Sequence, residues 1–142
     1  MRNYKTWYWV AAVFQFLTAG IHSLSFLNRA QPGNETEKTL LDLMHNYRQQ
    51  AGSMSFSMEE IMIALSACLT FVYLFGGLTN AWLLRRTQDE TVLGGILAIN
   101  LVVFGALFVI MVVYTFLPPI IMTGCVFLFL LVAAVMRKLV SR

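Results

Sequence analysis

The sequence predicts an all-α fold: an integral membrane four-helix bundle with a short extracytoplasmic amphipathic helix between the first and second spans. Of the 142 residues, 58% are hydrophobic and only 12% are charged, whereas water-soluble domains are about a quarter charged. Four long apolar runs and a one-sided distribution of basic residues point the same way. The length fits a single transmembrane domain over residues 1–142.

The four apolar runs cover residues 7–27, 58–84, 92–117 and 119–136. Each has about the length that a helix needs to cross a ~30 Å hydrocarbon core. Within lipid every backbone polar group must be bonded internally, so a span is a helix or part of a closed barrel. Barrel strands are short and alternate in polarity, whereas these runs are apolar on all sides, and we therefore expect helices. The first run is too long for a cleaved signal peptide and is expected to remain as an anchor.

Basic residues identify the cytoplasmic side. With four crossings, seven Lys and Arg residues fall on the side that holds both termini, together with only two acids, Asp89 and Glu90. The other side has three basic and five acidic residues, so the net charges are +5 and −2 and give the +3 of the chain. Because Lys and Arg are enriched in cytoplasmic loops, we expect both termini in the cytoplasm. The seven basic residues are Arg2, Lys5, Arg85, Arg86, Arg137, Lys138 and Arg142.

The segment between the first two spans is the only sizeable stretch outside the membrane. Asn34 followed by Glu37 has the spacing of a helix cap and its reciprocal partner. The apolar residues that follow recur at helical intervals. We expect a short amphipathic helix over about residues 35–49, lying at the outer interface or capping the bundle, and then a loop from Gly52 to Ser57. The apolar positions of this helix are Leu40, Leu41, Met44 and Tyr47.

Two further residue pairs bear on the fold. Pro118-Pro119 is expected to end a helix between the third and fourth spans, since Pro cannot continue one and disfavours helix at the residue before it.

Cys68 and Cys125 both fall inside predicted spans. We expect them to act as small apolar side chains rather than as a disulfide framework.

Polar residues recur along one side of each of the first two predicted spans. Such side chains are costly in lipid and usually face the bundle interior. Hydroxyl and amide groups on this face can bond across helices, so the simplest role for the stripe is structural. The intramembrane polar stripe comprises Gln15, Thr18, Ser66, Thr70, Tyr73 and Asn80, with Asn100 alone in the third span. His22, Ser25 and Arg29 continue the same spacing of three and four residues at the end of the first span.

A candidate outer polar site combines His22, Glu59, Glu60 and His45. His22 falls late in the first span, and both glutamates begin the second span at the same level. We expect His22 and Glu59 to approach each other, with His45 folding over them from the outer segment. Carboxylates beside a histidine can relay protons, bind a cation or act as acid and base. The alternative is structural, because acidic residues are favoured in the first turn of a helix.

Methionines suggest a weaker metal site. Met54, Met58 and Met62 are four residues apart and would share one face of a helix, and thioether ligands suit Cu(I). Met is also common filler in apolar helices, and we expect no bound cofactor. No nucleophile elbow, phosphate-binding loop, metalloprotease helix or Cys-x-x-Cys pair is present in the sequence. An intramembrane enzyme is therefore the weaker interpretation.

Three short segments resemble a family of uncharacterised small bacterial four-helix inner-membrane proteins. They are Gly20-Ile21-His22-Ser23, the outer positions Leu43, Met44 and Tyr47, and Gly77-Leu78-Thr79-Asn80. The resemblance covers roughly the first half of the chain and contains no catalytic motif. It implies a four-helix fold in a bacterial inner membrane and brings no known activity.

The expected function follows from these features. We expect a membrane-embedded accessory or assembly component, or a binder of a small apolar molecule between the helices. The alternative is metal or proton handling at the outer His, Glu and Met positions. The expected partners are the lipid bilayer and a membrane protein or a second copy of the chain. The basic charge is not clustered with any nucleic-acid-binding motif, so no nucleic acid is expected.

Overall fold

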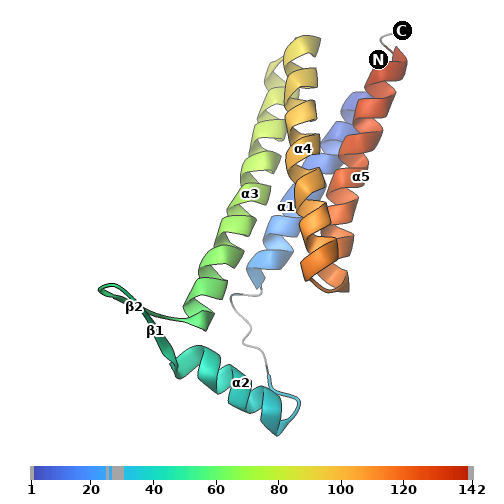
Figure 1. Ribbon diagram of the computed structural model, residues 1–142. Helices are drawn as coiled ribbons and strands as arrows, with labels where there is room; N and C mark the ends of the chain where they lie inside the picture. Colours follow the sequence, from blue (N-terminus) through green and yellow to red (C-terminus); the bar gives the residue numbers. More distant parts are fainter. Residues whose placement is uncertain (1, 25, 27–30, 141–142) are drawn as a thin grey trace.

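A computed structural model describes residues 2–24, 26 and 31–140. Five helices and one two-stranded hairpin account for most of this part of the chain (Figure 1). The helices are α1 (Arg2–Leu24), α2 (Glu35–Asn46), α3 (Met58–Arg86), α4 (Glu90–Tyr114) and α5 (Leu117–Val140). The strands are β1 (Arg48–Ala51) and β2 (Met54–Ser57). The predicted helical character is confirmed, with the hairpin as a small addition.

Three of the described helices, α3, α4 and α5, are long and apolar enough to cross a membrane. This confirms a membrane protein with transmembrane helices. The 23 residues of α1 are also sufficient in number, but Gln15, Thr18, His22 and several Tyr and Trp residues lower its hydropathy. Helix α1 therefore differs in composition from the other three long helices.

Helix α1 packs against both α3 and α5, and α4 packs against α5. The contact between α3 and α4 is much smaller, although they follow each other in the chain. The two helices lie close together at the end of the bundle that holds the termini, and they diverge toward the other end (Figure 1). The fully buried core positions include Tyr8, Leu93, Leu97, Val126, Leu130 and Ala133.

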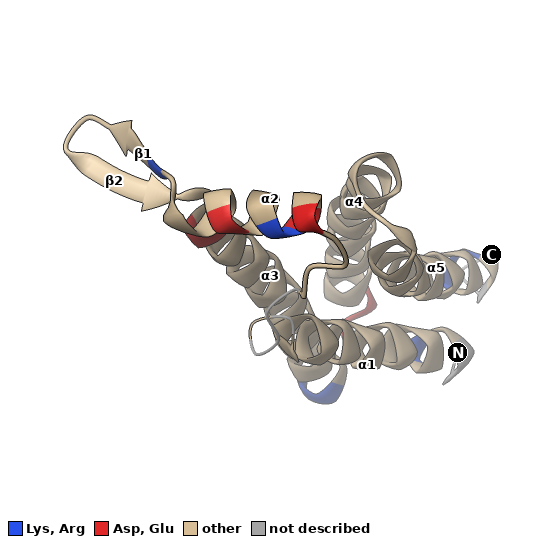
Figure 2. Ribbon diagram, turned by 90° about the horizontal axis from the view of Figure 1, so that it is seen from below, with Lys and Arg blue, Asp and Glu red and all other residues tan. Residues whose placement is uncertain are grey.

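Helix α2 and the hairpin lie beyond the end of the bundle opposite the termini (Figure 1). Seen from this end, α2 runs beside the end of α3, and the hairpin projects away from the other helices (Figure 2). The Oδ1 atom of Asn34 accepts a bond of 2.8 Å from the backbone N–H of Glu37, which confirms the predicted cap. The Glu37 carboxylate accepts from the backbone N–H of Gly33 at 2.6 Å and from the Asn34 side chain at 3.1 Å, not from the Asn34 backbone as expected of its reciprocal partner. We call α2 and the hairpin together the outer cap.

The predicted extent of the outer helix was wrong at its C-terminal end. The helix stops at Asn46, and residues 48–57, expected as helix end and loop, form the antiparallel hairpin. Gly52 explains the turn, because its φ of 63° is readily adopted by glycine and suits a two-residue hairpin loop. Alternation reinforces the strands: Ala51, Met54 and Phe56 share one face, and the other face is polar.

The role predicted for Pro118-Pro119 was also wrong. Helix α4 already ends at Tyr114, where the Thr115 backbone N–H and hydroxyl both donate to the Met111 carbonyl at 3.0 and 2.7 Å. The two prolines instead lie in the first turn of α5. The backbone N–H groups of the first turn have no acceptor within the helix, so proline, which lacks an N–H, is well tolerated there.

Candidate functional site

Four buried polar side chains meet in the centre of the bundle. The Tyr8 hydroxyl donates to Asn80 Oδ1 at 2.7 Å, and Asn80 Nδ2 donates to Gln15 Oε1 at 2.9 Å. Asn80 and Asn100 exchange bonds of 3.0 and 3.1 Å, and Gln15 Nε2 donates to Asn100 at 3.3 Å. We call Tyr8, Gln15, Asn80 and Asn100 the amide network. It joins α1, α3 and α4, and Gln15 and Asn80 are both 0% exposed.

The other residues of the predicted polar stripe make two kinds of hydrogen bond, between helices and within one helix. Tyr73 is buried, and its hydroxyl lies 2.7 Å from that of Thr123 on α5. Thr18 and Thr70 instead donate to the carbonyls of Phe14 and Ser66, one turn earlier in their own helices. The first kind bonds across helices, and the second satisfies hydroxyls locally, as is usual for Thr within helices.

A third polar cluster, which the sequence did not predict, closes the end of the bundle near the termini. Tyr4 hydrogen-bonds the carboxylate of Glu90, and Lys5 Nζ lies 3.0 Å from the same carboxylate. Arg137 donates to the Glu90 carbonyl at 2.6 Å and lies over Gly94, where a Cβ would come within 2.2 Å of its guanidinium. The signal available in the sequence was Glu90 itself, an acid among basic residues at this end.

At the opposite end, the start of α3 is shaped by a capping box. The Ser57 hydroxyl accepts from the backbone N–H of Glu60 at 3.2 Å, and the Glu60 carboxylate accepts from the backbone N–H of Ser57 at 2.8 Å. This reciprocal pair fixes the first turn of the helix. Arg48 of β1 places two guanidinium nitrogens 3.2 Å from the two Glu60 oxygens. Its guanidinium also donates to the Ser55 hydroxyl and carbonyl at 3.0 and 2.7 Å.

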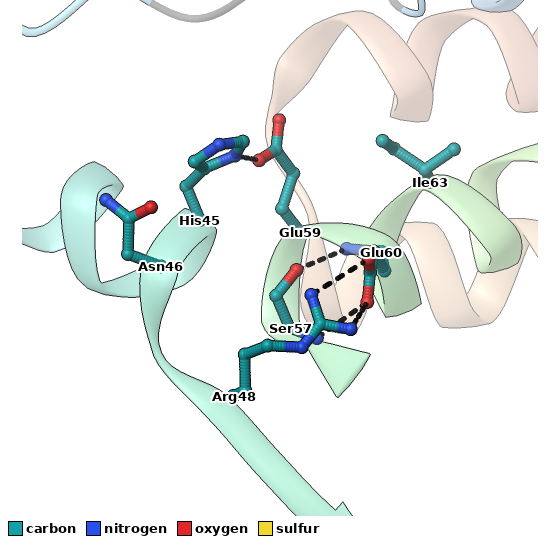
Figure 3. Close-up of a pocket in the computed structure, with 7 residues that line it drawn as sticks. All are labelled: His45, Asn46, Arg48, Ser57, Glu59, Glu60 and Ile63. Atoms are coloured by element: carbon teal, nitrogen blue, oxygen red, sulfur yellow. Dashed lines mark hydrogen bonds and ion pairs between the residues drawn. The ribbon is translucent and has the colours of Figure 1, made fainter. Parts of the chain in front are cut away.

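A cavity of about 350 Å³ lies between the end of α2, the hairpin and the start of α3. Figure 3 shows its lining, in which His45 Nδ1 contacts the Glu59 carboxylate beside the pair formed by Arg48 and Glu60. Ile63, one turn further along α3, provides an apolar part of the wall. We call this cavity the outer pocket. It combines an imidazole, a guanidinium and two carboxylates drawn from three separate elements.

Three of the four predicted outer-site residues, His45, Glu59 and Glu60, therefore line one pocket. The expected approach of His22 to Glu59 is not seen in the part of the chain that the structure describes. Glu59 contacts His45 there, and the His22 ring packs edge-on against Phe26, with 6.2 Å between ring centroids. Ser25 and Arg29 lie outside the described residues. Arg48, which the sequence did not single out, completes the pocket.

The methionine site does not assemble as expected. Met54 lies in β2 and only Met58 and Met62 lie on α3, so the three do not share a helical face. Met54 and Met62 are 67% and 52% exposed. Among the described residues, no group of three His, Cys, Asp or Glu side chains is placed to hold a metal ion. The hairpin, which breaks the helical spacing at Met54, accounts for the difference.

Comparison with known proteins adds no family. No protein family, curated protein sequence or solved structure matches this chain.

Proposed function

We propose that this chain crosses a bacterial inner membrane four times, with α1 as the first span and both termini in the cytoplasm, and acts as an accessory or assembly component for a membrane protein partner. The amide network is the observation that carries this proposal. In this network the buried amide side chains of α1, α3 and α4 bond to one another. Such bonds hold helices together, as expected of a scaffold. A catalytic site would keep such groups directed at a substrate.

The network also supports α1 as a span. Gln15 and Tyr8 would be costly in lipid if α1 lay alone, but both are fully buried against α3 and α4. A span of low hydropathy is acceptable when its polar groups face protein. The cluster around Glu90 then joins the starts of α1 and α4 to the end of α5 on the basic side, which the distribution of Lys and Arg assigns to the cytoplasm.

Helix α3 offers the largest surface to a partner. It is the longest of the described helices, with 29 residues, and the rest of the chain covers less of it than of α4 or α5. Leu65, Phe71 and Phe75 are 64–73% exposed on it. In a membrane without a partner these side chains contact only lipid, so removing them would be neutral. In a complex they become the contact surface.

The proposal is tested by affinity purification in mild detergent followed by mass spectrometry. We expect a membrane protein at constant ratio through a second, size-exclusion step, and its loss from the double variant Phe71→Ala and Phe75→Ala. The matched control is Val102→Ala and Val109→Ala on α4, which are similarly exposed and should keep the partner. Purification of the chain with lipid alone, or with a bound metal or an absorbing cofactor, would contradict the accessory role.

A further inference from the structure

The outer pocket has an arrangement of charge that its structural role does not require. Two polar pairs lie side by side, a contact between the His45 imidazole and the Glu59 carboxylate and an ion pair between Arg48 and Glu60. Surface pairs of this kind contribute little to stability, yet here they surround a cavity of about 350 Å³. This volume is at the lower end of the range typical of small-molecule sites.

Several polar atoms remain available to a ligand. One Glu59 oxygen contacts His45, and Figure 3 shows the other directed away from the imidazole. Arg48 has five N–H donors, and the bonds to Glu60 and Ser55 use four of them. Of the groups in these contacts, the pocket thus keeps one Glu59 carboxylate oxygen and one Arg48 N–H for a ligand. This pattern matches a ligand that carries both a positive and a negative group.

The position of the pocket specifies the ligand further. At 1.5 Å per residue the 29 residues of α3 extend about 43 Å, close to the ~40–45 Å thickness of a bilayer with its headgroups. The pocket at the start of α3 therefore lies at headgroup level when Arg85 and Arg86 lie at the opposite surface. Ile63, 51% exposed, leads from the pocket onto the lipid-facing side of the helix.

We propose that the outer pocket binds the phosphoethanolamine headgroup of an outer-leaflet phospholipid, with its ammonium on Glu59 and its phosphate on Arg48 and His45. A primary ammonium has three N–H donors for a carboxylate, and a guanidinium is well suited to phosphate. The acyl chains then follow Ile63 along α3. This inference needs α3 to cross the membrane, and it does not depend on the accessory role proposed above.

The test uses the whole purified chain, stripped of lipid in mild detergent, and measures binding by the rise in thermal stability on titration. Phosphatidylethanolamine should bind about tenfold more tightly than phosphatidylcholine, because one charge-assisted bond is worth about that factor. Stepwise N-methylation of the lipid should weaken binding progressively, and this series needs no protein variant. Equal binding of all methylation states, or tighter binding of phosphatidylglycerol, would overturn the proposal.

Two variants test the assigned contacts. Glu59→Gln should remove the preference for the ammonium lipid, and Arg48→Gln should weaken every phospholipid about equally. Lys38→Gln, on the exposed side of α2, is the matched control and should change neither. Competition by free phosphoethanolamine at millimolar concentration distinguishes a lipid headgroup from the free compound as the ligand. If it competes only weakly, the lipid assignment stands, whereas binding of the free compound as tight as that of the lipid would contradict an acyl-chain contribution and overturn it.

Discussion

The middle of this bundle and its outer end use polar residues in opposite ways. In the middle, amide and hydroxyl groups are buried and bond directly from helix to helix, as Tyr8, Asn80 and Asn100 do. At the outer end, α3 and α4 have separated, and the polar groups are exposed charges around the outer pocket. Uncharged groups of low desolvation cost hold the helices together in the middle, and charged groups lie at the two ends, where their side chains are partly exposed.

The amide network and the outer pocket are therefore expected to contribute to different properties, the first to stability and the second to binding. Interhelical bonds in the amide network add to the free energy of folding, whereas partly exposed ion pairs add little to it. Substitutions in the network should therefore lower global stability, and substitutions at the outer end should change local structure or binding. Four substitutions test this division, and the largest effect is expected in the amide network.

Asn80→Leu should have the largest effect. It removes the bonds to Tyr8, Gln15 and Asn100 and leaves their polar groups buried without this partner. Interhelical hydrogen bonds in membranes average ~0.6 kcal/mol each, so the loss should be about 2 kcal/mol. Thermal unfolding in detergent measures it. Gln50 is an exposed amide in the hairpin, so Gln50→Leu should leave the unfolding transition unchanged. Equal effects of Asn80→Leu and Gln50→Leu would contradict the proposed difference between the buried network and the outer end.

Gly76→Ala should cost about 1 kcal/mol. A Cβ at Gly76 would lie 2.8 Å from Gln15 Nε2 and 2.9 Å from Phe104 Cζ, and such overpacking costs about 1–3 kcal/mol. The better helix propensity of Ala returns up to ~1 kcal/mol. Gly95→Ala is the control, since nothing lies within 4 Å of its added Cβ, and it should be neutral or stabilising. A stabilising Gly76→Ala would show that α3 and α4 do not approach closely there.

Ser57→Ala should loosen only the start of α3. It deletes the side chain that accepts from the Glu60 N–H, and loss of such a cap costs about 1 kcal/mol. Hydrogen exchange of residues 58–61 should become faster, while the global unfolding temperature falls by less than in Asn80→Leu. Ser53→Ala, in the exposed hairpin turn, provides the comparison. Faster exchange throughout α3 would indicate that the two ends are coupled rather than independent.

Arg48→Gln should have the smallest effect on stability and a local one on structure. It releases the hairpin from Glu60, because the two charge-assisted bonds at 3.2 Å are lost. Limited proteolysis should cut residues 48–57 more readily without any shift in the unfolding transition. The same digestion of Lys38→Gln controls for charge alone. Unchanged cleavage would mean that the turn at Gly52 holds the hairpin without help from Arg48.

Much of this architecture could be predicted from the sequence, because lipid imposes strong and simple constraints. The length of the apolar runs located the long helices to within a few residues, and the inward polar stripe at Gln15, Asn80 and Asn100 was recognisable from the cost of polar groups in lipid. The Asn34 cap of α2 follows from local chemistry and was equally accessible.

Pairing between elements could not be predicted in the same way. The hairpin was missed because the helical spacing up to Tyr47 concealed the alternation that follows it, and the turn depends on one glycine. Glu59 was expected to meet His22, but α2 brings His45 to it instead. That choice depends on how the outer cap folds back, which no single segment specifies. Arg48 became visible as a site residue only when the hairpin placed it beside Glu60.

In the proposed four-span topology α1 crosses the membrane together with α3, α4 and α5, so that Asn3 and Gln88 lie on one side and Gln50 lies on the other. Single cysteines at Asn3, Gln50 and Gln88, in a chain whose Cys68 and Cys125 are replaced by Ala, test it with a membrane-impermeant maleimide on intact cells. We predict that position 50 reacts from outside and that positions 3 and 88 react only after permeabilisation. Reaction of positions 3 and 50 together in intact cells would show that α1 does not cross, and the four-span account would fail.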